Sequence, residues 1–403
     1  MSEPWKTDQY FVSPLNYLED VTREFNLPKH VQIHDITLRD GEQETGVAFR
    51  KDEKIRIAEA LAEAGVHRIE AGMPAVSKQD EEAIREIAKR NLGPEIYSFS
   101  RCIVDDVKRA VDCGVDGIVV EIPSSEHIIE YAYQWPLEKA IDLSVKATSF
   151  AHEQGLRVVF FTIDATRAKF DWLMQILDKV AAEGHMDALA LVDTMGVAST
   201  PAIRYYVREV KKRIDKPLEA HFHNDFGLAN ANSLAAVEEG AEVIHSTVLG
   251  MGERAGQAST EQIALALELL YGYDTGIKLD KLTELGLLVA DLSGHVLPVN
   301  QPVVGERIFQ LESGIPSAWW MTVKDTRPTE VMPVLPSLMG AGDVEVVLGK
   351  GSGTDSLAFY LDKLGLSVPE DRMLDLLMMV KEKSMEKKGL LTEDEFEALV
   401  GAL

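Results

Sequence analysis

The chain has 403 residues, of which 46% are hydrophobic and 27% are charged, as in an ordinary globular protein. Its formal net charge of −25 repels nucleic acids and anionic membrane surfaces, and no apolar run approaches the roughly 18 residues of a membrane span. We therefore expect neither a nucleic acid nor a membrane as a partner. The N-terminal MSEPWKTDQYFV lacks the basic and apolar regions of a signal peptide, and only Cys102 and Cys113 are present, which predicts a cytoplasmic protein.

Strand-like and helical patterns alternate through most of the chain. Eight short runs rich in Val, Ile and Phe read as buried strands, at residues 31–38, 67–71, 95–100, 116–122, 157–163, 187–193, 217–223 and 242–249. Helical patterns follow each of them, at residues 50–64, 78–90, 103–113, 136–154, 168–183, 200–214, 227–239 and 259–272. Eight βα units in series predict an α/β protein with a (β/α)8 TIM barrel. A doubly wound sheet also alternates, but no GxGxxG turn follows the first run.

The alternation stops after about residue 275, which divides the chain into segments of different character. We expect an N-terminal extension at 1–30, the barrel at 31–290 and a lid or linker rich in Pro and Gly at 291–342. A smaller C-terminal subdomain at 343–403 opens with a strand and a glycine loop, DVEVVLGKGSG. Its helices are expected near residues 353–364, 369–388 and 392–402.

Conspicuous polar residues lie at the C-terminal ends of the predicted strands, where TIM barrels carry their active sites. In chain order these are Arg39, Asp40, Gln43, Glu70, Arg101, Glu121, Ser125, Thr194, His221, His223 and, after the last strand, Gln257. Because neighbouring strand ends of a barrel meet at one mouth, these side chains are expected to surround a common site.

Two histidines suggest a metal centre. His221 and His223 are two residues apart on a predicted strand, so their side chains point to the same face. An isolated histidine of this kind is usually structural, but Asp40 is expected across the barrel mouth. Three such ligands with open positions are typical of a catalytic divalent cation, and the donor types admit Mn, Mg, Zn, Co or Fe(II).

Three charged residues near this centre have alternative interpretations. Arg39 and Asp40 alone would form a surface ion pair, whereas beside a metal Arg39 suits the stabilisation of a developing oxyanion. Glu70 either orients Arg39 or a metal-bound water molecule, which is the interpretation we favour, or binds the metal directly. Glu121 either is satisfied in the core or binds substrate. The residues alone thus predict metal-assisted chemistry on a small, anionic, oxygen-rich molecule.

Five segments resemble the DRE-TIM metallolyase superfamily. They are ITLRDGEQ, RIEAGMP, DTMG at 193–196, HFHNDFGLANAN at 221–232 and GMGERAG at 250–256, and they span about residues 31–275 in the family's order. This superfamily includes 2-isopropylmalate, homocitrate and citramalate synthases and hydroxymethylglutaryl-CoA lyase. The tail resembles the synthase branch, through NQPVVGERIFQLESGI and VVLGKGSG.

The resemblance implies a role for each matching residue. Asp40, His221 and His223 would bind the metal, with Gln257 at the position where the family's GERxGN motif has Asn. Arg39 would stabilise the enolate and oxyanion, Gln43 would assist at the acyl carbonyl, and Glu70 would hold Arg39. Thr194 would contact the carboxylate of a 2-oxo acid, and Arg101, Glu121 and Ser125 are further candidates for substrate binding.

The implied reaction is a Claisen-type condensation of acetyl-CoA with a 2-oxo acid, followed by thioester hydrolysis. The resemblance also implies a homodimer in which one subunit's lid covers the other's barrel. Two departures concern proton removal: Pro316 replaces a lid histidine, and GAGDVEVV lacks an expected tyrosine. Either His295 or Glu312 then supplies a base, or the chain cleaves a 3-hydroxy acid or its CoA thioester. A catalytically silent binding subunit is a third hypothesis.

Overall fold

The computed structural model describes residues 3–403, which form two compact units. Leu15–Val296 make up one unit, and Leu297–Leu403 together with the N-terminal residues up to Pro14 make up the other. No helix within residues 3–403 combines the length and the apolarity that crossing a membrane requires.

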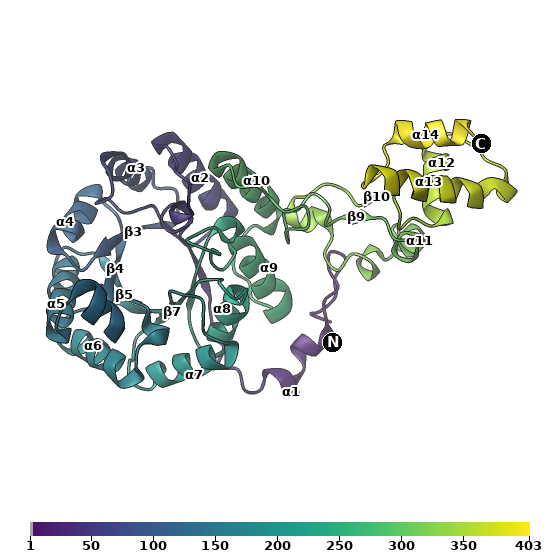
Figure 1. Ribbon diagram of the computed structural model, residues 1–403. Coiled ribbons are helices and arrows are strands. Elements are labelled where there is room, and N and C mark those ends of the chain that lie inside the picture. Colours follow the sequence, from purple (N-terminus) through teal and green to yellow (C-terminus); the bar gives the residue numbers. More distant parts are fainter. Residues whose placement is uncertain (1–2) are drawn as a thin grey trace. The chain divides into compact units, whose positions relative to one another are not determined.

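Eight parallel strands form a closed barrel in the first unit, and they follow one another around it in sequence order (Figure 1). They are β1 (Gln32–Asp35), β2 (Arg68–Glu70), β3 (Glu95–Arg101), β4 (Gly117–Pro123), β5 (Arg157–Ile163), β6 (Ala188–Asp193), β7 (Leu218–Phe222) and β8 (Val243–Ser246). β1 pairs with β2 on one side and with β8 on the other, which closes the barrel. The predicted TIM barrel is confirmed.

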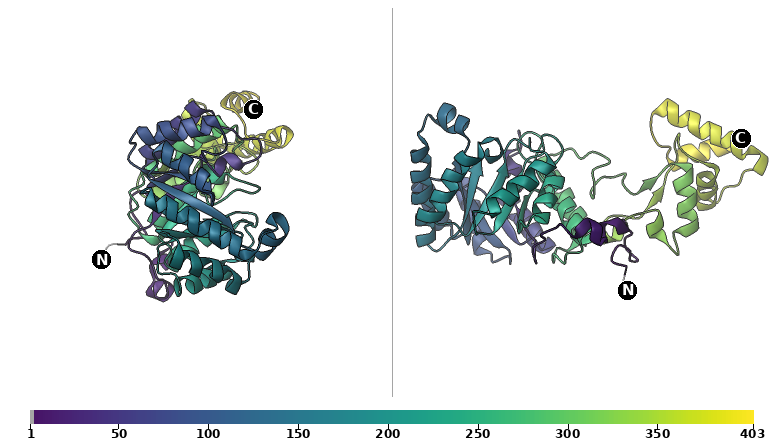
Figure 2. Two further views of the ribbon diagram at one scale, coloured as in Figure 1. Left: turned by 90° about the vertical axis from the view of Figure 1, so that its left-hand side faces the viewer. Right: turned by 90° about the horizontal axis from the view of Figure 1, so that it is seen from below.

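Helices surround the barrel, and each follows its strand (Figure 2). They are α2 (Lys51–Ala64), α3 (Lys78–Lys89), α4 (Val104–Cys113), α5 (Leu137–Glu153), α6 (Phe170–Glu183), α7 (Thr200–Lys211), α8 (Ala229–Glu238) and α9 (Thr260–Tyr271), with α1 (Glu19–Thr22) before the barrel and α10 (Leu282–Ser293) after it. α2 illustrates how the sequence sets these elements. Ile57, Ala58 and Leu61 form its buried face, and Gly65 ends it in the left-handed conformation, at φ 86°.

Alternate residues of the strands fill the barrel with apolar side chains. Tyr97 and Phe99 of β3 pack with Val159 and Phe161 of β5 and with small residues of β6. The rings of Phe99 and Phe161 meet edge to face, with their centroids 5.3 Å apart. This aromatic pair forms the floor beneath the polar residues of the mouth.

The ends of two strands differ from the prediction. β1 stops at Asp35 because the Asp35 carboxylate accepts a hydrogen bond from the backbone N–H of Thr37, at 3.0 Å, and the chain then turns. Arg39 and Asp40 consequently lie on the loop before a short 3-10 helix, Gly41–Gln43. The prediction that His223 lies on the seventh strand is wrong by one residue, since β7 ends at Phe222 and His223 forms an isolated bridge with Gln257.

The second unit is mainly helical. It contains α11 (Gly314–Val323), α12 (Thr354–Leu364), α13 (Met373–Lys387) and α14 (Glu393–Gly401), with a parallel pair formed by β9 (Gln310–Leu311) and β10 (Glu345–Val346). Leu357, Leu376 and Phe396 are fully buried in its core. The N-terminal segment belongs to this unit through a bridge between Tyr10 and Val334. The division of 291–403 into a lid and a C-terminal subdomain stays a prediction.

Candidate active site

Asp40, His221 and His223 converge at the C-terminal end of the barrel. One ligand-type atom from each residue can be chosen so that all three lie within 4.8 Å of one another. Asp40 comes from the loop after β1, His221 from the end of β7 and His223 from the residue beyond it. All three are buried, and His221 Nε2 lies 3.7 Å from Asp40 Oδ2.

Several polar atoms of this cluster have no hydrogen-bond partner within the described part of the chain. They are Asp40 Oδ1, His223 Nδ1 and both side-chain polar atoms of Gln257. Buried polar atoms in folded proteins are nearly always satisfied, so unsatisfied ones around a single point call for a ligand. Burial lowers the pKa of His223, and burial together with His245 lowers the pKa of His221 well below its ordinary value. Two neutral imidazoles and a carboxylate suit a divalent cation.

Arg39 is fixed on several sides and keeps one free donor. Its guanidinium forms ion pairs with Glu70 and, at 2.5 Å, with Asp40, and it lies over the ring of Phe99 at 3.9 Å. Gln43 accepts a long hydrogen bond from it, at 3.4 Å. Burial lowers the pKa of Arg39, but the two carboxylates outweigh burial and raise it. Its buried Nη2 has no partner among residues 3–403 and is therefore available to an oxygen atom of a substrate.

Glu121 and Arg101, two predicted substrate-binding residues, differ in their surroundings. Burial raises the pKa of Glu121 to about 7, although Arg39 and Arg101 oppose the shift. Arg101 is half exposed and makes two hydrogen bonds to Asp106, at 2.6 and 3.2 Å, in the first turn of α4. The Arg101 guanidinium is thus already engaged by a carboxylate of its own chain.

Ser125 and Thr194, the other two predicted substrate-binding residues, both form hydrogen bonds with Asp164, a residue that the sequence analysis did not identify. Ser125 Oγ donates to the buried carboxylate of Asp164 at 2.6 Å, and Thr194 Oγ1 accepts from the Asp164 backbone N–H at 2.8 Å. Asp164 has φ 64°, a left-handed conformation that is strained for a residue with a side chain. Arg167 and His127 also bind its carboxylate. A carboxylate directly after the fifth strand was the signal that could have found it.

Sequence reasoning also missed a buried polar group beneath the metal candidates. It consists of His34, Arg68, Glu219 and His245, which come from four different strands. One signal was available, because Glu219 lies two residues before His221 on β7 and must share its face.

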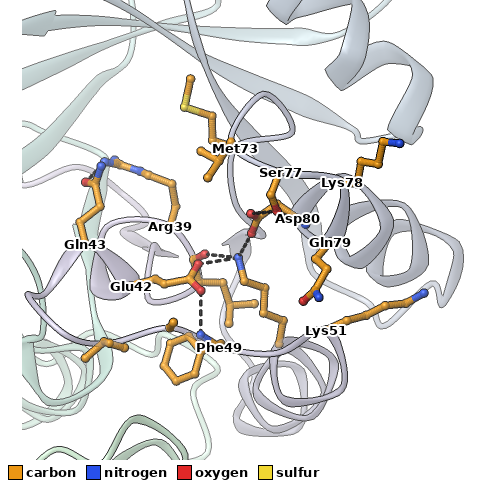
Figure 3. A pocket seen from close by; sticks show the side chains of 15 residues that line it. Arg39, Glu42, Gln43, Phe49, Lys51, Met73, Ser77, Lys78, Gln79 and Asp80 are labelled. Carbon is orange, nitrogen blue, oxygen red and sulfur yellow. Dashed lines mark hydrogen bonds and ion pairs between the residues drawn. The ribbon is translucent and has the colours of Figure 1, made fainter.

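A cavity of about 600 Å³ lies beside the site (Figure 3). Arg39 and Gln43 lie together at one side of it, and Lys51 and Lys78 lie at the other. Lys54 is buried in its wall, where its ammonium group pairs with Glu42 and Asp80 and donates to the Leu38 carbonyl. The cavity therefore joins the reactive end of the site to a positively charged wall.

The two candidate bases are not equally available. Glu312 accepts a hydrogen bond from the Gly351 backbone N–H at 2.7 Å and so fixes the glycine loop of its own unit. His295 Nδ1 lies 3.1 Å from Glu44, which directly follows Gln43. Pro316 stands in the first turn of α11, where a missing backbone N–H costs nothing.

Comparison with known proteins gives the relationships of the chain. Residues 30–289 match the family model described as HMGL-like. The homocitrate synthase AksA of Methanopyrus kandleri is 37% identical over 384 residues, which are 95% of each chain. The 2-isopropylmalate synthase of Methanocaldococcus jannaschii is 39% identical over 386 residues, which are 95% of this chain and 73% of that one.

Among solved structures, the HMG-CoA lyase of Bacillus subtilis superposes with a TM-score of 0.61 at 22% identity, over 68% of this chain and 96% of the lyase. This likeness bears on the fold alone. The sequence relationships extend over nearly the whole chain, and the family match covers the entire barrel. The chain therefore belongs to the HMGL-like family.

Proposed function

We propose that this chain catalyses the metal-dependent condensation of acetyl-CoA with a 2-oxo acid, giving a 2-hydroxy dicarboxylic or tricarboxylic acid and CoA. The observation that carries the proposal is the convergence of Asp40, His221 and His223 beside the free donor of Arg39. Relatives at 37% and 39% identity are named homocitrate synthase and 2-isopropylmalate synthase, and both match over 95% of this chain.

Asp40, His221 and His223 would hold the divalent cation, with the amide oxygen of Gln257 as a further ligand. When bound, the cation supplies Lewis-acid polarisation of the substrate's oxygen atoms. The carboxylate and the two imidazoles match that role, since one ligand-type atom from each residue lies within 4.8 Å of the others.

Arg39 carries the electrostatic part of the reaction. A base removes a proton from the acetyl methyl group, the resulting enolate carbon attacks the keto carbon of the 2-oxo acid, and the alkoxide that forms takes up a proton to give the hydroxyl group. Arg39 donates from Nη2 to the oxygen on which negative charge develops, while Glu70 and Asp40 hold the guanidinium in place. Water then hydrolyses the thioester and releases CoA. Gln43, next to Arg39, would assist at the acyl carbonyl.

The two substrates would enter from different sides of the mouth. The cavity that runs from Arg39 to Lys51 and Lys78 is suited to the anionic arm of an acyl-CoA. Thr194 and Ser125 border the opposite wall around Asp164 and would bind the carboxylate end of the acceptor acid. His295, backed by Glu44, is the better placed of the two candidate bases. A homodimer with exchanged lids also remains part of the proposal.

The test incubates the purified protein with acetyl-CoA and a pool of 2-oxo acids, with and without a chelator, and identifies products by mass spectrometry. We expect a hydroxy acid and free CoA thiol only when metal is present. Asp40→Ala should abolish both metal content and turnover, whereas Asp52→Ala, at an exposed carboxylate on α2, should change neither. No product from any 2-oxo acid, or cleavage of a 3-hydroxyacyl-CoA in its place, would refute condensation.

A further inference from the structure

Arg68, Glu219 and His245 form a buried chain of hydrogen bonds that ends at His221. Arg68 Nη1 of β2 donates to Glu219 Oε1 of β7 at 2.7 Å. The other carboxylate oxygen, Glu219 Oε2, lies 2.7 Å from Nε2 of His245 on β8. The Nδ1 of His245 lies 3.3 Å from the Nδ1 of His221. Glu219, His245 and His221 are at most 1% exposed, so these contacts are shielded from bulk water.

The positions of the protons along this chain follow from counting donors and acceptors. The Glu219 carboxylate, paired with Arg68, only accepts, so His245 carries its proton on Nε2. A neutral imidazole has one such proton, and Nδ1 of His245 is therefore an acceptor. His221 must then donate from its own Nδ1, which leaves a lone pair on Nε2, the nitrogen that lies 3.7 Å from Asp40.

A His245 protonated on both nitrogens would give the opposite arrangement, because it would donate to His221 and leave the proton of His221 on Nε2. Nitrogen-15 NMR distinguishes these two states.

A second cation at His34, Glu219 and His245 is also geometrically conceivable, since one ligand-type atom from each lies within 4.8 Å of the others. Both Glu219 oxygens and the Nε2 of His245 are already bonded, however, and Arg68 contacts the same carboxylate. The positive charge of Arg68 disfavours a cation there. The group is consequently better suited to holding His221 than to holding an ion.

We infer that Glu219 and His245 are positioning residues that hold His221 in the tautomer whose Nε2 is open to the divalent cation. This inference rests on the metal site in the proposed function and extends it to two residues with no direct contact to the cation. Partners of this kind fix the ring orientation and tautomer of ligating histidines, and their loss commonly costs 10–100-fold in metal affinity.

Glu219→Gln is the most informative substitution, because it preserves the shape of the side chain and reverses the hydrogen-bond relay. By the relay we mean the hydrogen bonds that run from residue 219 through His245 to His221. The Gln amide can keep its oxygen on Arg68 and donate its N–H to Nε2 of His245. His245 then carries its proton on Nδ1 and donates to His221, whose proton moves to Nε2. We expect Mn²⁺ titrated into the metal-free full-length variant to bind roughly 10–100-fold more weakly, by calorimetry.

Substitutions of His245 provide a rescue test. The amide oxygen of His245→Gln can still accept from Nδ1 of His221, so Mn²⁺ affinity should stay within a few-fold of wild type, whereas His245→Leu should lose it. Glu95→Gln is the matched control, because Glu95 also contacts Arg68, at 3.3 Å, but lies outside the relay. Its Mn²⁺ affinity should be unchanged.

Nitrogen-15 NMR of labelled histidines in the metal-free wild-type protein reads the tautomers directly and needs no variant to fold. The proton of His221 is expected on Nδ1 and that of His245 on Nε2. Finding the His221 proton on Nε2, or a folded Glu219→Gln with wild-type Mn²⁺ affinity, would overturn the relay. Failure of wild-type protein to bind Mn²⁺ would instead refute the metal assignment, while the NMR result would still decide the relay.

Discussion

The guanidinium of Arg39 has almost no conformational freedom. Glu70, Asp40 and the Phe99 ring hold it from three directions, and its Nη2 has no partner among residues 3–403. A donor fixed before the reaction stabilises a developing charge without reorganisation, and the loss of one such donor typically costs 10²–10³ in rate.

We therefore expect Arg39→Ala to lower kcat by roughly 10²–10³ in the condensation assay, with the fold retained by circular dichroism. Arg39→Lys should recover little of this loss, because a lysine lacks the planar fork that contacts Glu70 and Asp40 together. A change of less than about tenfold in Arg39→Ala would remove this residue from the catalytic group.

Glu121 should make stability depend on pH in a defined direction. Its pKa is raised from 4.5 to about 7 in the folded protein, mainly by burial, so the folded state binds this proton more tightly than the unfolded state. The free energy of unfolding should consequently fall as the pH rises from about 4.5 through 7.

Glu121→Gln removes this titration. At pH 8 the variant should be more stable than the wild type by about 3 kcal/mol, and near pH 4 the two should be equal. Urea unfolding of chelator-treated protein at several pH values measures the difference. If the free energies of unfolding of the two proteins changed in parallel between pH 4 and pH 8, the raised pKa of Glu121 would be contradicted.

At the scale of elements, Lys54 joins the loop that carries Arg39 and Asp40 to two helices. Its ammonium group, on α2, contacts Glu42 at 2.6 Å, Asp80 of α3 at 2.5 Å and the Leu38 carbonyl at 3.3 Å. The Lys54 side chain is only 2% exposed, so removal of its charge would leave two carboxylates poorly compensated.

Lys54→Met should lower the free energy of unfolding by about 3–5 kcal/mol, the usual cost of breaking a buried ion pair from one side. Lys51→Met is the control on the same helix, because Lys51 is 44% exposed and pairs with Glu82 at a longer 3.4 Å. Its effect should stay within about 0.5 kcal/mol. Guanidinium chloride unfolding gives both values, and equal midpoints for the two variants would show that the Lys54 contacts contribute little.

The elements also show what the sequence could and could not predict. Runs of Val, Ile and Phe located all eight strands, because buried parallel strands are apolar on both faces. The end of β1 was missed, since ITL continues the apolar pattern while the Asp35 side chain diverts the backbone.

A similar contrast holds for the site. The strand order alone brought Asp40 and the two histidines to one mouth, but the pairing of particular side chains from different strands, such as Glu219 with His245 and Arg68, cannot be read from the residue spacing within any one strand. Arg101 also shows that the position of a residue in the sequence does not reveal its contacts. Its position at a strand end indicated a substrate contact, and only the structure reveals that Asp106 already binds it.

At the scale of the whole molecule, the net charge of −25 opposes the approach of anionic substrates. The cavity wall offsets this locally with Lys51 and Lys78. Replacing both by Glu should raise KM for acetyl-CoA about tenfold at low ionic strength and leave kcat unchanged, and the effect should shrink in salt as charges are screened.

Steady-state kinetics at two ionic strengths tests this expectation. Lys179→Glu/Lys212→Glu is the matched control, because both side chains are more than half exposed, lie outside the cavity lining and change the net charge by the same amount. If both double variants raise KM equally, the overall field, and not the cavity wall, governs the approach of the substrate.

The barrel closes at the seam between its first and last strands. Asp40 lies on the loop after β1, His221 is the penultimate residue of β7 and Gln257 follows β8, and β1 pairs with β8 to close the barrel. A cation held by these residues would therefore act as a cross-link over the seam of the cylinder, between segments that the chain must bring together over its longest loop. Withdrawal of such an ion would loosen that seam before the opposite wall of the barrel, so that the proposed metal site would also join the first and last strands of the fold.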